Sequence, residues 1–143
     1  MCALFEILIT ILDGSDPDGM ELRFTTCNRF TRDTDLKQLF QVASSTTPSG
    51  HSDIERALKE AVNGHLSQIH ERPLSVYILT DGDWADWGPE TILLELVGKL
   101  KELDLPRTAL GVQFISFGEK PSTLQYLQIL DDMSSTGGFG LTQ

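Results

Sequence analysis

The feature that most constrains the fold of this sequence is an apolar run, Leu74 to Thr80, that ends abruptly in Asp81, Gly82 and Asp83. A short apolar run bounded by turn residues is typical of a strand buried on both faces of a sheet. In open α/β sheets, ligands bind beyond the carboxyl ends of such strands. Asp81 is therefore the first candidate binding residue, although Asp-Gly turns also serve purely structural roles.

Expected strands alternate with expected helices after residue 20, which is the signature of βαβ units and of a mostly parallel sheet. The clearest helix has apolar residues at helical spacing, among them Ile54, Leu58 and Val62. Ser52 and Glu55 form a capping-box pattern at its start. The expected strands are Met20 to Cys27, Leu74 to Thr80 and Gly111 to Phe117, and the expected helices are Asp35 to Val42, Ser52 to His70, Pro89 to Leu103 and Ser122 to Leu130.

The two ends of the sequence are less regular. Ala3 to Leu12 contains β-branched residues that favour a strand, yet its apolar residues on every side also suit a fully buried helix. The segment contains Glu6 and has no basic residue before it, so it makes a poor signal peptide, and it is too short to span a bilayer. An intracellular, cytoplasmic location is the default expectation. Ser134 to Gln143 is rich in Gly, Ser and Thr and is expected to be a loose tail.

Length and charge narrow the class of protein. With 143 residues, the chain is expected to form a single domain, 1–143, around one core. Eleven basic and 21 acidic residues give a net charge of −10, which disfavours nucleic acid and anionic membranes as partners. Cations or basic surfaces fit better. Cys2 and Cys27 do not make a disulfide framework, and both are expected to be reduced thiols.

Two familiar metal sites are not expected. Asp13 to Gly19 resembles part of a calcium-binding loop, but Gly14 and Thr25 stand where the first and twelfth ligands would be needed. This segment is interpreted as a solvated turn. A zinc site is not expected either, because no two histidines are four residues apart and neither cysteine is placed to join them.

Three segments together resemble a von Willebrand factor A-type domain of the intracellular branch: Asp16 to Leu22, Pro48 to Ile54 and Tyr77 to Gly82. The resemblance extends over roughly Ala3 to Met133 and depends mainly on the order of these short motifs. It implies a Rossmann-like α/β fold, with a mostly parallel sheet flanked by helices. It also implies a protein–protein interaction module and no enzyme.

The resemblance further implies a metal-ion-dependent adhesion site. Such a site holds Mg²⁺ or Mn²⁺ through oxygen ligands and leaves one position open for a carboxylate of the protein partner. Asp81 corresponds to the family's carboxylate, and Ser52 stands where the family has a hydroxyl ligand. Ser52 also suits a helix cap, and one hydroxyl can hardly serve both purposes. Whether it is ligand or cap is left open by the sequence.

The first loop of that site departs from the family pattern. The family reads Asp-x-Ser-x-Ser there, whereas the nearest match, Asp13 to Pro17, ends in a proline without a hydroxyl. The next expected strand begins at Met20, too soon for a crossover between parallel strands. Ala3 to Leu12 therefore aligns better with the helix that follows the family's first strand. The resemblance thus implies a domain incomplete at its amino terminus, with a degenerate site that binds Mg²⁺ or Mn²⁺ weakly.

The loop after Asp81 holds further candidates. Asp83 and Asp86 would add negative charge near the site. Trp84 and Trp87 suit contacts with a partner, because tryptophan is enriched at interfaces, but they suit equally a lid on the end of the sheet.

A catalytic alternative is a Mg²⁺-dependent phosphatase of the haloacid-dehalogenase type. Asp81 would be its nucleophile and Asp83 its acid/base. Its later motifs would be Ser116, Lys120 and Asp131-Asp132. These phosphatases have glycine where this chain has Trp84, and the Asp-Asp pair follows Lys120 too closely for an intervening helix and strand. The interaction module is therefore preferred.

Overall fold

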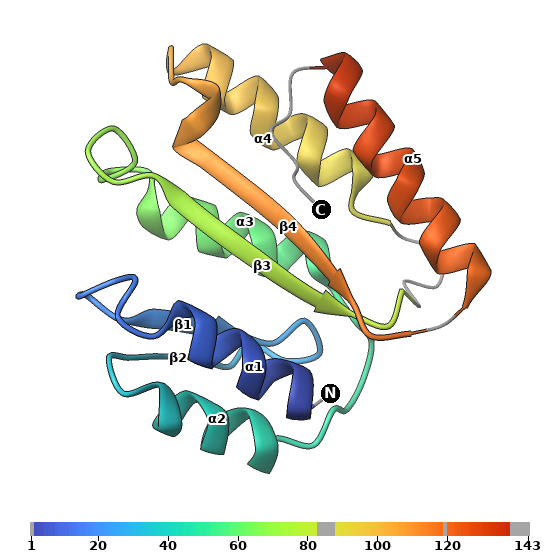
Figure 1. Ribbon diagram of the computed structural model, residues 1–143. Coiled ribbons are helices and arrows are strands. Elements are labelled where there is room, and N and C mark those ends of the chain that lie inside the picture. Colours follow the sequence, from blue (N-terminus) through green and yellow to red (C-terminus); the bar gives the residue numbers. More distant parts are fainter. Residues whose placement is uncertain (1, 83–87, 119, 138–143) are drawn as a thin grey trace. The chain divides into compact units, whose positions relative to one another are not determined.

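The computed structural model describes residues 2–82, 88–118 and 120–137, which form a mixed α/β fold (Figure 1). In these ranges there are five α-helices, a short 3₁₀ helix and two two-stranded sheets. The chain divides into two compact units, Met1–Ala57 and Leu58–Gln143. The expected α/β class is confirmed, while the expectation of a single domain stays a prediction.

A β-hairpin forms the sheet of the first unit. Strands β1 (Met20–Arg23) and β2 (Phe30–Asp33) pair in antiparallel register from Met20↔Asp33 to Arg23↔Phe30. Gly19 precedes β1 with φ +86°, and a Cβ there would overlap the carbonyl oxygen of Asp33. The turn before the hairpin therefore requires glycine.

The expected single strand from Met20 to Cys27 is wrong in its second half. The carbonyl oxygens of Phe24, Thr25 and Cys27 accept hydrogen bonds from the Arg56 side chain at 3.1–3.4 Å. They are therefore not paired in a sheet, and the chain bends over residues 25–28 before it returns as β2. The prediction of a mostly parallel sheet is thus not met in this unit.

Two helices accompany the hairpin. Helix α1 (Cys2–Leu12) resolves the ambiguity of that segment in favour of helix, and its Phe5 ring stacks on Phe40 of α2 (Leu36–Ser45) at 6.2 Å. Asp35 caps α2 by accepting a hydrogen bond from the Lys37 N–H, as the predicted helix from Asp35 requires. Helix α1 is not buried on all sides, because its Ile7 and Ile11 are 57% and 69% exposed.

The second unit contains a βαβ arrangement. Strand β3 (Leu74–Thr80), helix α4 (Glu90–Glu102) and strand β4 (Leu110–Ser116) follow one another. The two strands pair in parallel from Leu74↔Leu110 to Thr80↔Ser116. Helix α3 (Ile54–His65) begins in the first unit and continues into the second, the 3₁₀ turn Arg107–Ala109 precedes β4, and α5 (Pro121–Gly137) follows it.

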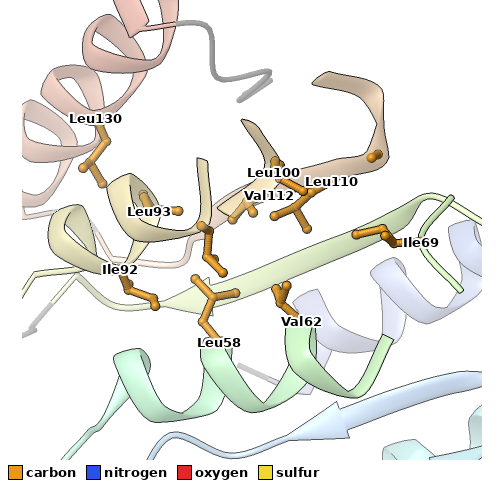
Figure 2. Close-up of a cluster of buried hydrophobic side chains, with 11 residues drawn as sticks. Leu58, Val62, Ile69, Ile92, Leu93, Leu100, Leu110, Val112 and Leu130 are labelled. Atoms are coloured by element: carbon orange, nitrogen blue, oxygen red, sulfur yellow. The ribbon is translucent and has the colours of Figure 1, made fainter. Parts of the chain in front are cut away.

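The hydrophobic core of the second unit gathers side chains from α3, α4, α5 and β4, with one residue each from the turns after α3 and from the 3₁₀ turn (Figure 2). Alternate β-strand residues, such as Val76 and Val112, pack on this cluster, while the intervening Tyr77 and Ile115 do not belong to it. Strand β3 is therefore not buried on both faces as predicted: within the described ranges it pairs with β4 alone, and of its residues Thr80 alone is fully buried. The core residues are Leu58, Val62, Ile69, Ile92, Leu93, Leu96, Leu100, Ala109, Leu110, Val112 and Leu130.

Several helix ends differ from the prediction. Helix α3 ends at His65, and turns follow to Glu71, although Ile69 within them is buried. Leu103, the expected last residue of the helix from Pro89, follows the last residue of α4 and is exposed. Helix α5 extends to Gly137, so residues 134–137 are helical rather than a loose tail, and residues 138–143 lie outside the described residues.

Two smaller expectations concern cysteine and membranes. Cys27 is a free cysteine, as expected. In the part of the chain that the structure describes, none of the helices combines the length and apolar character needed to cross a membrane.

Candidate functional site

The candidate site is the turn that follows β3, at the carboxyl end of the parallel pair. The carbonyl oxygen of Thr80 accepts a hydrogen bond from the Phe117 N–H at 3.1 Å, which continues the β3–β4 ladder beyond the strand ends. The Thr80 hydroxyl turns inward and accepts a hydrogen bond from the Gly82 N–H at 2.9 Å. Thr80 is buried, and its two hydrogen bonds fix the turn to the ends of β3 and β4.

The backbone of Asp81 is held from α5 and from the end of β4. The Thr123 hydroxyl, on a side chain that is only 3% exposed, lies 3.4 Å from the Asp81 carbonyl oxygen and donates to it. A Cβ at Gly118 would lie 3.0 Å from the same oxygen. Gly82 has φ +78°, and a Cβ there would overlap the Thr123 side chain. The close packing around the turn thus depends on two glycines.

Asp81 itself is exposed, in contrast to the buried residues that hold its backbone. A carboxylate on a fixed backbone loses little conformational freedom when it binds. Its oxygen atoms suit a hard cation such as Mg²⁺ or a basic group of a partner. Asp81 directly follows the carboxyl end of β3, at the position that the sequence predicts.

A second set of contacts lies beside the turn, between the start of α4 and α5. Burial raises the pKa of the Tyr126 hydroxyl, and the neighbouring Glu90 carboxylate raises it further. A Cβ at Gly88 would overlap both the Tyr126 hydroxyl and the Glu90 carboxylate. The Tyr126 hydroxyl of α5 thus lies beside Gly88 and the Glu90 side chain at the start of α4.

Ser52 does not cap α3. The carboxylate of Asp53 accepts a hydrogen bond from the Arg56 N–H at 2.9 Å, and the Asp53 carbonyl accepts one from the Ala57 N–H. Asp53 is thus the N-cap, and the predicted capping box from Ser52 is wrong. Ser52 instead donates a hydrogen bond from its hydroxyl to the Thr25 hydroxyl oxygen at 2.9 Å. Because Asp53 is an equally good cap one residue later, the sequence pattern does not distinguish the two.

The two predicted metal ligands belong to different units, Ser52 to the first and Asp81 to the second. Their joint role in a cation site therefore stays a prediction. Among the described residues, no group of three or more His, Cys, Asp or Glu side chains is placed to hold a metal ion. Asp83, Trp84, Asp86 and Trp87 lie outside those residues.

The later motif residues of the phosphatase alternative lie at the end of β4, before α5 and within α5. Ser116 is the last residue of β4, and its hydroxyl accepts a hydrogen bond from the Gly118 N–H at 3.4 Å. Asp131 and Asp132 lie within α5 and not in a loop after a strand. Lys120 precedes α5, and its carbonyl accepts the Thr123 N–H. The phosphatase alternative likewise stays a prediction.

Thr123 was missed by sequence reasoning, although it is central to the turn. It lies in the first turn of a helix 42 residues after Asp81, and its sequence neighbourhood carries no motif. Comparisons with protein-family models, with curated proteins and with solved structures found no match to this chain.

Proposed function

We propose that the chain is a protein-interaction module of the von Willebrand factor A type, with a Rossmann-like fold, in which Asp81 is the central contact residue. The observation that carries this proposal is the exposed Asp81 carboxylate on a backbone held by Thr80, Gly82 and Thr123. The turn lies at the carboxyl end of a parallel strand, where ligands of α/β proteins bind. The role is binding rather than catalysis.

Any cation bound here is held weakly. Asp81 is the carboxylate ligand of a degenerate metal-ion-dependent adhesion site, with Ser52 as the proposed hydroxyl ligand. Mg²⁺ retains its own waters unless several protein oxygens replace them, so two ligands give little affinity. A carboxylate of the protein partner would complete the coordination. Because Ser52 does not cap α3, capping does not compete with its proposed role as a ligand.

Mn²⁺ tests the ion site, because it broadens the NMR signals of nearby amides even when it binds weakly. We expect the Asp81 and Gly82 amides to broaden at millimolar Mn²⁺, and Asp81→Asn to abolish this broadening. Asp104→Asn is the matched control, since Asp104 is an exposed aspartate elsewhere in the same unit and asparagine tolerates its positive φ. Broadening that is equal in wild type and Asp81→Asn would contradict the site, and a micromolar affinity would contradict its degenerate character.

The interaction role is tested with the same variants in a pull-down of partner proteins. We expect wild type and Asp104→Asn to capture a common partner that Asp81→Asn no longer captures. Chelator should reduce the capture by wild type if a cation bridges the two proteins. A partner that binds all three forms equally would show that Asp81 is not the contact residue.

A further inference from the structure

The segment that joins α2 to α3 is an exposed stretch of irregular chain with a bend at Gly50 (Figure 1). Residues 47–53 are all exposed, and Thr46 at its start has extended backbone angles, φ −86° and ψ 117°. The Thr46 N–H bonds to Val42 and the Asp53 N–H to Thr25, which anchors the two ends. Within the described ranges, no backbone hydrogen bond joins residues 47–52 to other residues. The start of this segment, around Thr47, is therefore exposed and accessible to an enzyme.

The hydroxyl groups in and beside this segment differ in their hydrogen bonds. Those of Ser45 and Thr46 donate to the Val42 carbonyl at the end of α2, at 3.3 and 2.7 Å. That of Ser52 donates to Thr25. The Thr47 hydroxyl makes no hydrogen bond to any described residue. Its reaction would consequently break no contact of the folded chain.

Thr47 is followed by Pro48, and no peptide bond in the described residues is cis. The proline ring disfavours helical angles at the preceding residue, so it keeps Thr47 extended. Of the six prolines in the sequence, Pro48 alone follows a serine or threonine; the residues before the others are Asp16, Arg72, Gly88, Leu105 and Lys120. The chain thus contains one Ser/Thr-Pro dipeptide, and it lies in the exposed segment.

We propose that Thr47 is a phosphorylation site for a proline-directed serine/threonine kinase. The γ-phosphoryl group of ATP would form a bond to Thr47 Oγ1 while its bond to the ADP oxygen breaks. The hydroxyl proton passes to the base of the kinase. This regulation lies beyond the proposed interaction at Asp81 and does not depend on it.

The phosphate would act on the end of α2. It carries a charge of about −1.5 to −2 at neutral pH. Thr47 follows Thr46, the C-cap of α2, and this fully described helix has no basic residue in its last turn. The phosphate dianion would therefore lie close to the negative end of the helix dipole, and no basic side chain in the last turn would offset the repulsion. Phosphorylation is expected to loosen the last turn of α2.

The test treats the full chain with a purified mitogen-activated protein kinase and ATP, and locates the phosphate by mass spectrometry. We expect one phosphate, on Thr47. Thr47→Val and Pro48→Ala should abolish it, whereas the matched control Ser49→Ala should retain it. A synthetic peptide of residues 42–54 serves as the kinase control. Because the segment is exposed, the folded chain should react within about tenfold of the peptide rate.

Three results would overturn the proposal: phosphate on another residue, incorporation that survives Pro48→Ala, or a folded chain that reacts more than about 100-fold more slowly than the peptide. The effect on α2 is read from hydrogen exchange of the Thr46 amide, which bonds to Val42. This amide should exchange about two- to fivefold faster in the phosphorylated chain. Unchanged exchange would contradict the loosening of α2.

Discussion

The first N–H groups of a helix have no partners within the helix, and in α3 the carboxylate of Asp53 accepts one of them. Arg56, which donates that N–H, also directs its guanidinium to the carbonyls of Phe24, Thr25 and Cys27. Ser52 lies one residue before the cap and bonds to Thr25. The Asp53 N–H also donates a hydrogen bond to the Thr25 carbonyl at 2.8 Å. The loop after β1 is thus held against the start of α3 by the Ser52 hydroxyl, the Asp53 N–H and the Arg56 guanidinium.

The assignment of the cap can be tested by single substitutions. Asp53→Ala should lower the free energy of unfolding by about 0.5–2 kcal/mol, because a helix N–H loses its acceptor. Ser52→Ala, which removes an exposed hydroxyl, should cost less than about 0.5 kcal/mol. Urea denaturation followed by circular dichroism measures both. Asp53→Asn is the control and should remain close to wild type, since asparagine caps equally well; a larger loss for Ser52→Ala than for Asp53→Ala would return the cap to Ser52.

At the scale of elements, the sequence was most informative where a segment is defined by its own residues. Strand β3 has the predicted bounds, because an apolar run is closed by Pro73 at one end and by Asp81-Gly82 at the other. The hairpin was not predicted as such, because Arg56, far along the chain, draws the carbonyls after β1 out of any sheet. The turn at Asp81 was predictable as a position, but its contacts with Thr123 depend on tertiary packing.

Helix α3 offers a test of the core. Leu58→Ala should lower the free energy of unfolding by about 2–5 kcal/mol, because Leu58 is 3% exposed and its loss leaves a cavity. Leu94→Ala, in α4, is the matched control: Leu94 is 54% exposed, and its truncation should cost less than about 0.5 kcal/mol. Chemical denaturation measures the two variants. Similar losses for both would mean that Leu58 does not belong to the core.

At the scale of the whole molecule, charge was predictable and the arrangement of parts was not. The net charge of −10 follows from composition and favours cations or basic surfaces as partners. The division into two units falls after Ala57, inside helix α3, and no change of composition marks it. Periodicity reports which face of a helix is buried, but not which unit the helix belongs to.

Tyr126 gives the stability of the protein an alkaline limit. Its pKa is raised in the folded chain, mainly by burial, whereas an unfolded tyrosine has a pKa of about 10. The contribution of neutral Tyr126 to the free energy of unfolding is therefore complete below pH about 10. It is lost as the pH rises toward the raised pKa of the folded chain, because the Tyr126 hydroxyl of the unfolded chain releases its proton first. Above pH about 10, the free energy of unfolding should fall more steeply for wild type than for Tyr126→Phe. Parallel pH profiles would contradict this.

Gly82 limits the substitutions that this turn can accept as the sequence diverges. Its positive φ and its close approach to Thr123 both disfavour a side chain at position 82. A smaller residue at position 123 would relieve the overlap but not the strain of the positive φ. Descendants that keep this turn should therefore keep glycine at position 82. Position 81, whose side chain is exposed, is under no such restriction. Evolution can thus change the side chain presented at this edge of the sheet by replacing one residue, without rebuilding the turn that presents it.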